Sequence, residues 1–297
     1  MLFYILSDLQ NYENTADFTI FTKNKRRMTL FPNCKINIGL DVLRKRPDGY
    51  HDIETVMYPV YGICDSLEII RSSEAEAELT GSGLPVDCSP GDNLVMKAYR
   101  LLRAEYGIEG VKMHLHKNIP TGAGLGGGSS NAAFAVKALD SVFGLGLTTE
   151  KMESLCARLG SDVPFFIRNT PQFCSGRGEI MSPVAMRLTG KYIAIVKPDA
   201  NISTGEAYAG ITPSSAGIGL EEKITDPVEK WPGMIENAFE KTVFDKHPQI
   251  KMLKKSLYSS GAVYASMTGS GSAVYGIFNK KPSCISTIYG NAFISAL

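Results

Sequence analysis

The chain has 297 residues, 44% of them hydrophobic, and this length exceeds that of a typical single domain, so two domains are expected. Its net charge of +1 gives no electrostatic reason to expect a nucleic-acid or membrane partner, and no apolar run is long enough to span a bilayer. The six scattered cysteines favour a reducing, cytoplasmic setting over a disulfide framework or a zinc site.

Residues 1–27 are expected to be an N-terminal extension. Residues 1–6 are apolar but short and lack a preceding basic region, so they do not resemble a signal peptide. A basic cluster at residues 23–27 precedes Met28, which is a candidate for the natural start. One short basic cluster is usually a solvated surface, so an arm that binds nucleic acid is the weaker interpretation.

Residues 33–40 roughly alternate polar and apolar side chains, which predicts a half-buried strand. Lys35 and Asn37 would share one face of this strand, opposite Ile36 and Ile38. From the pattern alone, Lys35 would lie on the solvated face of an edge strand.

A Pro-Asp-Gly sequence within residues 46–51 predicts a turn, and Tyr50 and His51 follow it directly. A strand is expected next, at residues 53–60. From the pattern alone, packing at the end of this strand would explain the two rings.

Short strands are expected at residues 67–70 and 75–79. Asp92 or Asn93 can then cap a helix that runs to Tyr106.

A glycine-rich stretch lies between a strand-like run at residues 111–116 and a helix whose apolar residues recur at spacings of three and four. Ser129 or Ser130 can cap this helix, and Gly144 can end it. Glycines let the backbone approach a ligand closely, and a helix start offers unpaired N–H donors, so a polyphosphate site is predicted. This site comprises Pro120, Thr121, Gly122, Ala123, Gly124, Leu125, Gly126, Gly127, Gly128, Ser129 and Ser130.

Other glycine loops fit this stretch less well. A Walker loop needs a Lys-Ser/Thr pair after its last glycine, and Ser129 stands there instead. Three glycines match a dinucleotide fingerprint, but the acidic residue expected after a second strand is missing, since Asp140 falls inside the helix. A flexible linker is not expected between a strand and a capped helix.

Thr148 and Thr149 can cap a helix at residues 150–159, and a turn at residues 160–166 follows. Phosphoryl transfer to an alcohol needs a group that orients the hydroxyl and accepts its proton, and Asp162 in this turn is the best candidate. Asp162 can equally cap a short helix, because a proline soon after it suits a first helical turn.

A hairpin is expected around Arg177, which is a surface charge or, less favourably, a phosphate contact. A change of domain is expected near residue 185, and Ser203 or Thr204 can cap a helix after the next strand. Residues 231–240 are an ordinary helix junction by pattern. The remaining expected elements are a helix at 249–258, strands at 262–266 and 273–278 around a second glycine loop at 267–272, and a short helix and strand within 281–297.

Several of these stretches, in this order, resemble the GHMP kinases. Residues 120–130 resemble the family's Pro-x-x-x-Gly-Leu-Gly-Ser-Ser loop, and residues 160–166 match its Gly-x-Asp-Val-Pro-Phe-Phe motif at every fixed position. Residues 34–38 resemble its Ala/Cys-Lys-x-Asn-Leu/Ile strand. The triple glycine and the Asp-Gly-Tyr-His sequence at residues 48–51 resemble the branch whose substrate carries cytidine diphosphate. Residues 236–240 resemble the family's Asn-Asp-Phe/Leu-Glu segment only in part, because Ala238 replaces its Asp, and an ordinary helix junction explains them equally well. The resemblance covers about residues 31–297.

The resemblance implies an α+β chain of two domains with the site between them. Residues 28–184 would form a ribosomal-protein-S5-like domain that binds ATP, and residues 185–297 a ferredoxin-like domain. ATP would be the co-substrate, with Mg²⁺ that the Ser130 hydroxyl would help to hold. Nothing in the pattern indicates an oligomeric state.

The resemblance also implies roles for individual residues. Asp162 would be the catalytic base, and Lys35 would place positive charge beside the acceptor hydroxyl and the transferring phosphoryl group. Asn93 would lie near the adenine of ATP. The substrate residues would be Asn37, Tyr50 stacked on cytosine, His51 bonded to the base edge, Thr204 and, in the second glycine loop, Gly269 and Ser270.

The resemblance therefore implies an ATP-dependent kinase for a small alcohol linked to cytidine diphosphate, in the non-mevalonate route to isoprenoid precursors. A mevalonate- or homoserine-type kinase is one alternative, and it would need no pocket for a base. A non-catalytic nucleotide-binding regulator is another, and it would be expected to lack Lys35 or Asp162, both of which are present.

Overall fold

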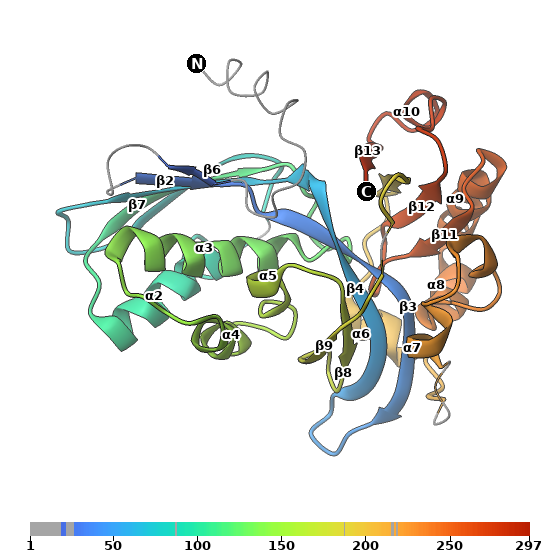
Figure 1. Cartoon of the computed structure of the whole chain (residues 1–297), viewed down its shortest axis with the longest axis horizontal. Coiled ribbons are helices and arrows are strands. Elements are labelled where there is room, and N and C mark those ends of the chain that lie inside the picture. Colours follow the sequence, from blue (N-terminus) through green and yellow to red (C-terminus); the bar gives the residue numbers. More distant parts are fainter. Residues whose placement is uncertain (1–18, 22–26, 87, 187, 215–216, 218) are drawn as a thin grey trace.

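The computed structural model describes residues 19–21, 27–86, 88–186, 188–214, 217 and 219–297. Within these residues the strands form three sheets, and the helices lie in two groups (Figure 1). Most of the expected N-terminal extension lies outside the described residues. Its described part, β1 (Thr19–Phe21), pairs with β2 (Arg27–Leu30) at one edge of the first sheet.

The first sheet has five strands in the order β1-β2-β5-β7-β6, and only the β6–β7 pair is parallel. Helices cover one of its faces (Figure 1), where apolar side chains such as Leu67, Tyr99 and Phe134 form one core. The further elements of this part are β5 (Ser66–Arg71), β6 (Glu78–Gly83), β7 (Val111–Lys117), α2 (Leu94–Tyr106), α3 (Gly127–Phe143), α4 (Thr149–Ala157) and α5 (Phe165–Arg168).

The start of α3 differs from the prediction. The helix begins within the triple glycine, and its N-cap is Gly126 in the left-handed conformation, without a side-chain cap. The predicted serine cap is wrong, because Ser129 and Ser130 already lie inside the first turn. Gly144 ends the helix as predicted, with its N–H donated to the Asp140 carbonyl.

The second sheet is antiparallel in the order β3-β4-β8-β9. Its strands are β3 (Asn33–Lys45), β4 (His51–Cys64), β8 (Gln172–Ser175) and β9 (Ile180–Pro183). The prediction of a half-buried β3 is wrong, since Lys35 and Asn37 are buried on one face and Ile36 on the other. The apolar face of β3 meets the third sheet through Tyr275. The glycine-rich stretch at residues 120–130, called the first glycine loop below, covers the polar face of β3.

The third sheet is antiparallel in the order β11-β12-β10-β13. The short helix and the closing strand that were predicted within residues 281–297 are both present. Its elements and their helices are β10 (Tyr192–Val196), β11 (Tyr264–Met267), β12 (Val274–Phe278), β13 (Phe293–Ala296), α6 (Thr204–Ala209), α7 (Leu220–Lys223), the 3-10 helix η2 (Val228–Lys230), α8 (Phe239–Lys246), α9 (Pro248–Ser259) and α10 (Ile285–Ile288).

Residue 185, near which a change of domain is predicted, lies between β9 and β10. Among the described residues, no helix combines the length and the apolar character that crossing a bilayer would require.

Candidate active site

The two predicted catalytic side chains lie next to each other, although they are far apart in the sequence. Lys35 Nζ is 3.4 Å from Asp162 Oδ2. The lysine side chain is almost fully buried on β3, whereas a third of the aspartate side chain is exposed and can meet a ligand. Asp162 precedes α5, whose N-cap is Pro164, so the alternative interpretation of Asp162 as a helix cap is wrong.

The Lys35 amine is held in one orientation by two further acceptors. It donates to Asn37 Oδ1 at 2.6 Å and to the Gly124 carbonyl oxygen at 3.1 Å. Asn37 is fixed in turn, because its Nδ2 donates to Thr55 Oγ1 at 3.1 Å. The amine therefore projects from β3 to the first glycine loop instead of into solvent.

The first glycine loop has the geometry that a phosphate cradle requires. Gly122, Gly124 and Gly126 have φ angles of 62°, 76° and 69°, which only glycine adopts readily. Ala123 and Leu125 are buried in the core and anchor the loop between these glycines. The loop runs directly into α3, whose first N–H groups have no side-chain cap and can therefore bind an anion.

Ser130 Oγ is buried and has no hydrogen-bond partner among the described residues. It lies in the first turn of α3. A buried hydroxyl without a partner is unfavourable, and a ligand that reaches it would relieve that cost. In the described part of the chain, no group of three or more His, Cys, Asp or Glu side chains could hold a metal ion.

The second glycine loop, predicted at residues 267–272, begins at residue 268 because Met267 is the last residue of β11. It joins β11 to β12 and folds onto the first loop. Thr268 Oγ1 accepts the Asn37 N–H at 3.0 Å and donates to the Gly124 carbonyl at 3.0 Å. A Cβ atom on Gly269 would lie 3.2 Å from Gly124 Cα. The two loops thus meet backbone to backbone, with the half-buried Ser270 next in the chain.

Tyr50 and His51 lie where the β3–β4 turn ends. Tyr50 is 55% exposed, so strand-end packing does not explain it, and the Arg177 guanidinium lies 4.9 Å from its ring centroid. The His51 ring stacks on Tyr208, with the ring centroids 4.5 Å apart. Burial, and secondarily the charge of Asp162, raise the pKa of the Tyr208 phenol. The Tyr208 phenol therefore lies within electrostatic reach of the Asp162 carboxylate.

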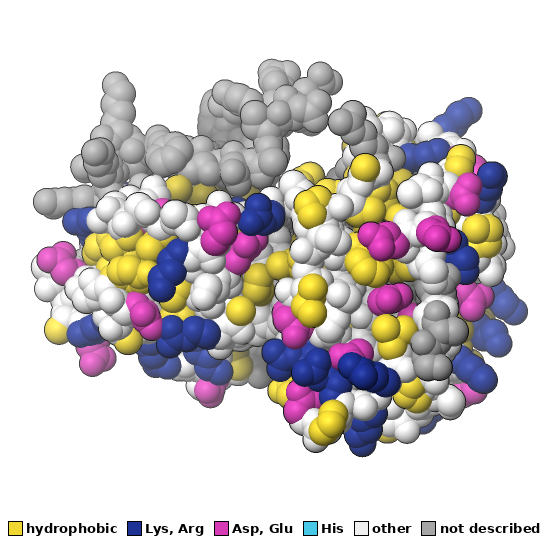
Figure 2. All heavy atoms as spheres, turned by 60° about the horizontal axis from the view of Figure 1, so that its bottom comes forward, with side chains coloured by type: hydrophobic (Ala, Val, Ile, Leu, Met, Phe, Trp, Pro, Cys, Tyr) yellow, Lys and Arg dark blue, Asp and Glu magenta, His cyan; other side chains and the backbone are white. Residues whose placement is uncertain are grey.

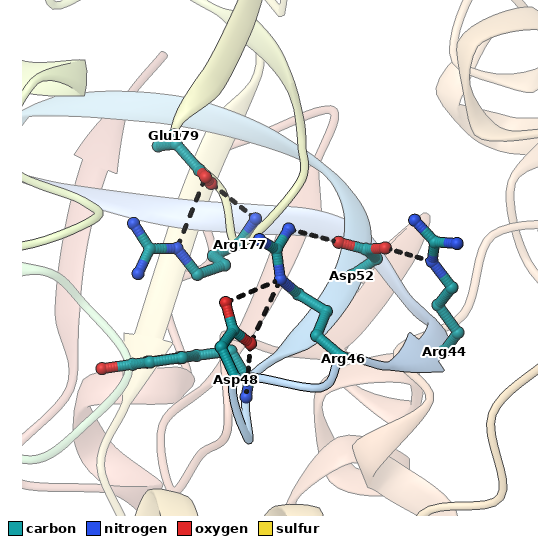
Figure 3. Close-up of polar contacts among 7 residues, drawn as sticks. Arg44, Arg46, Asp48, Asp52, Arg177 and Glu179 are labelled. Atoms are coloured by element: carbon teal, nitrogen blue, oxygen red, sulfur yellow. Dashed lines mark hydrogen bonds and ion pairs between the residues drawn. The ribbon is translucent and has the colours of Figure 1, made fainter.

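Ion pairs brace the turn that carries Tyr50 (Figure 3). Arg46 donates to Asp52 at 2.9 Å and to Asp48 at 3.1 Å, and Arg44 pairs with the other oxygen of Asp52. The hydrogen bonds from Arg44 and Arg46 lower the pKa of Asp52. Because the folded-state pKa is the lower one, this stabilisation is complete above the unfolded pKa of about 4. It is lost only as the pH falls through the lowered value.

The β8–β9 turn lies between the exposed Tyr50 ring and the Lys35–Asp162 pair. Arg177 reaches Tyr50 from this turn, and Glu179 accepts the Arg177 N–H at 2.5 Å (Figure 3). A Cβ atom on Gly178 would lie 4.0 Å from Asp162 Oδ1. Asp48, Asp52 and Glu179 pair with these arginines (Figure 3), and Figure 2 shows Asp and Glu side chains interspersed with Lys and Arg side chains on the face it draws.

A cleft lies between β6 and the starts of α2 and α3. It consists of two adjoining cavities of about 180 and 290 Å³, which share Val86, Cys88, Asn93, Leu115 and Lys117 in their linings. Asn93 caps α2 by accepting the Val95 N–H, as one prediction had it, and it also faces the cleft.

A buried polar network supports this cleft. Lys117 pairs with Asp65 and donates to Asn131 Oδ1 at 3.0 Å, and Asn131 Nδ2 donates to Asp65 at 2.8 Å. The other Asp65 oxygen accepts the N–H groups of Asn118 and Ile119, which lead into the glycine loop. One signal of this network was available before the structure: Asn131 directly follows the predicted phosphate loop. The single acidic residue Asp65 carried no such signal.

Comparison with known proteins places this geometry in a family. The model of the GHMP kinases N terminal domain matches residues 93–170, and that of the GHMP kinases C terminal matches residues 229–283. A protein of Bacteroides thetaiotaomicron named 4-diphosphocytidyl-2-C-methyl-D-erythritol kinase is 48% identical over 265 residues, which cover 89% of this chain and 96% of that protein. The chain belongs to the GHMP kinase family.

Other GHMP kinases agree with this assignment. A Cytophaga hutchinsonii protein of the same name is 46% identical over 256 residues, 86% of this chain and 94% of its own length. A crystal structure of a 4-(cytidine 5'-diphospho)-2C-methyl-D-erythritol kinase superposes with a TM-score of 0.73 at 26% identity, covering 90% of this chain and 98% of that one. A homoserine kinase from Cytophaga hutchinsonii, at 15% identity, has a TM-score of 0.64 over 94% and 97% and shows the shared fold.

Both matched GHMP regions contribute to the site. The N-terminal match contains Asn93, the first glycine loop and Asp162, and the C-terminal match contains the second glycine loop.

Thr204 is exposed at the start of α6, and the ring from this helix that meets His51 belongs to Tyr208. An aromatic residue one helical turn after Thr204 was the available signal for this contact.

Proposed function

We propose that this chain transfers the γ-phosphoryl group of ATP to the 2-hydroxyl of 4-diphosphocytidyl-2-C-methyl-D-erythritol. The observation that carries the proposal is the Lys35–Asp162 pair, whose amine also reaches the carbonyl of Gly124 in the glycine loop. Relatives at 46–48% identity bear the name of this kinase.

In the proposed reaction the acceptor hydroxyl lies against the exposed part of Asp162. A bond forms between the hydroxyl oxygen and the γ-phosphorus, and the bond from that phosphorus to the β–γ bridging oxygen breaks, so ADP leaves. The hydroxyl proton passes to the Asp162 carboxylate. The Lys35 ammonium, fixed by Asn37 and Gly124, stabilises the negative charge on the transferring oxygens.

The triphosphate would lie along residues 120–130, with its charge directed at the uncapped start of α3. The unpartnered Ser130 hydroxyl fits a ligand of Mg²⁺, with ATP oxygens and water supplying the remaining positions. Bound there, the ion would neutralise phosphate charge. The adenosine would occupy the cleft beside Asn93.

The cytidine diphosphate part of the substrate would extend from Asp162 past the β8–β9 turn to Tyr50 and His51. The exposed Tyr50 ring offers a base a surface to stack on, and His51 offers ring nitrogens to a base edge. Mevalonate and homoserine kinases need no such surface. The six described cysteines are all free thiols, which fits the cytoplasmic location proposed for an enzyme that uses ATP.

The deciding experiment measures ADP release with three alcohols: 4-diphosphocytidyl-2-C-methyl-D-erythritol, mevalonate and homoserine. Turnover of the first, with the other two at background, is expected. Turnover of only mevalonate or homoserine would contradict the substrate assignment. ATP binding without turnover of any of the three would favour a non-catalytic nucleotide-binding protein.

A further inference from the structure

The segment at residues 236–240 attaches to the strand that carries Lys35. The Leu40 N–H donates to the Glu236 carbonyl at 3.0 Å, and the Ala238 N–H donates to the Leu40 carbonyl at 2.8 Å. Between these two bonds lies Asn237, which is 2% exposed. This arrangement is more specific than the ordinary helix junction that the sequence pattern indicated.

The Asn237 side chain uses both of its amide N–H donors on backbone carbonyls at the second glycine loop. Its Nδ2 donates to the carbonyls of Met267, at 2.8 Å, and Gly269, at 2.9 Å. Its Oδ1 accepts the Phe239 N–H at 3.0 Å. The two carbonyls flank Thr268, so one amide group fixes the backbone on both sides of this residue.

Thr268 is the point at which the second loop touches the catalytic groups. Its hydroxyl accepts the Asn37 N–H and donates to the Gly124 carbonyl, the same carbonyl that accepts from Lys35 Nζ. A shift of Thr268 would therefore break its hydrogen bonds to the Gly124 carbonyl and to the Asn37 N–H. Gly124 and Asn37 are the residues that orient the Lys35 amine.

We propose that Asn237 is a positioning residue for phosphoryl transfer, which acts by fixing Thr268 against Gly124 and β3. This inference rests on the proposed kinase function. Asn237 does not contact the reacting groups, so its loss is expected to impair turnover more than it impairs ATP binding. Misplacement of reacting groups by about 1 Å can cost on the order of a hundredfold in rate.

The first test compares Asn237→Ala with Leu253→Ala. Leu253 is 4% exposed on α9 and belongs to the core of the same part of the molecule, so its truncation controls for loss of stability. At a temperature where both variants are folded, Asn237→Ala should lower kcat at least ~10-fold with KM for ATP within about threefold. Leu253→Ala should keep kcat within about twofold. Equal kcat values in the two variants would overturn the proposal.

The second test is a double-mutant cycle with Thr268→Val, which removes the hydroxyl and keeps the shape. If Asn237 acts through Thr268, adding Asn237→Ala to Thr268→Val should lower kcat by much less than it does in the wild type. Fully additive losses would show that Asn237 acts by another route, against the proposal.

Amide hydrogen exchange separates this inference from the proposed function. The Thr268 N–H donates to the Ala273 carbonyl and the Gly271 N–H to the Thr268 carbonyl. Both N–H groups should exchange faster in Asn237→Ala than in Leu253→Ala. Wild-type protein that phosphorylates none of the three alcohols would refute the function, while the exchange rates would still decide the positioning role. Unchanged exchange would overturn that role even in an active enzyme.

Discussion

At the residue scale, the pairing of a buried amine with a partly exposed carboxylate explains why both can serve one reaction. Lys35 is held by three acceptors and has little freedom, whereas Asp162 keeps an accessible side toward the acceptor alcohol. A fixed positive charge stabilises charge that develops in the transition state without reorganisation at the moment of transfer.

Replacing Asp162 by Asn keeps the shape of the side chain but removes the proton acceptor. We expect kcat to fall by about 10²–10⁴-fold, the usual contribution of a positioned base. Titration calorimetry with a non-hydrolysable ATP analogue should show nucleotide affinity within a few-fold of wild type, because the glycine loop is untouched. A turnover rate near that of wild type would remove Asp162 from its proposed role.

The exposed ring of Tyr50 gives a second prediction at this scale. Tyr50→Ala should raise KM for the cytidine-linked substrate by about 5- to 150-fold, since stacking of a base on an aromatic ring is worth about 1–3 kcal/mol. KM for ATP should stay unchanged. Tyr50→Phe keeps the ring under the Arg177 guanidinium and serves as the matched control. Equal KM values in the two variants would exclude stacking at this position.

At the scale of elements, the two glycine loops form one unit that allows a sharp comparison. Gly122 and Gly124 both have positive φ, so alanine at either costs about 1–2 kcal/mol of backbone strain. At Gly124 the new Cβ would also lie 2.1 Å from the Thr268 carbonyl oxygen, whereas at Gly122 it meets nothing within 4 Å. Gly124→Ala should therefore lower kcat at least ~10-fold more than Gly122→Ala, measured with saturating substrates. Similar rates would show that the loop contact is dispensable.

Local rules predicted the elements where a single residue decides the conformation. Asn93, Thr148 and Ser203 cap their helices by accepting backbone N–H groups, and Gly144 ends α3 in the left-handed conformation. The serine cap of α3 failed because Gly126 adopts a left-handed φ and starts the helix earlier. N-cap rules compare side chains that can accept a backbone N–H. They do not predict a helix that starts at a left-handed glycine without any side-chain cap.

The site was less predictable than its elements, because its contacts join distant segments. Residue pattern placed Lys35 on a solvated face, since alternation cannot tell that a loop and a third sheet cover both faces of β3. Residue pattern offered Asp162 equally as a proton acceptor or as a helix cap, and only the family resemblance gave Lys35 a catalytic role. The structure then brought the two side chains together. Asn237 lies in a segment whose family match was partial, and its bonds to the loop became visible only in three dimensions.

At the scale of the whole molecule, one apolar core links the strands that carry the catalytic lysine to the third sheet. Ile36 and Ile38 of β3 belong to the same buried cluster as Tyr264 and Tyr275 of β11 and β12. Tyr275 also donates its hydroxyl to the Asn37 carbonyl at 3.0 Å. The two glycine loops are therefore supported by a shared core, which keeps their mutual contact fixed.

The distribution of thiols over the molecule gives a prediction about nucleotide binding. Cys34, Cys156 and Cys174 are buried, and burial raises the pKa of the last two to about 12. These thiols should resist alkylation at pH 8, because only the thiolate reacts. Cys88 and Cys284 are exposed, and iodoacetamide should modify them first, as peptide mass spectrometry can measure.

Of the two exposed thiols, only Cys88 lines the cleft beside Asn93. A nucleotide in that cleft should exclude the reagent, so saturating ATP is expected to slow the modification of Cys88 at least ~5-fold. Cys284, at the start of α10, provides an internal control in the same sample, and its rate should not change. If ATP slowed both thiols equally, the effect would reflect the stability of the whole molecule, as expected for a ligand that binds only the folded state. If it slowed neither, adenosine would have to bind away from this cleft.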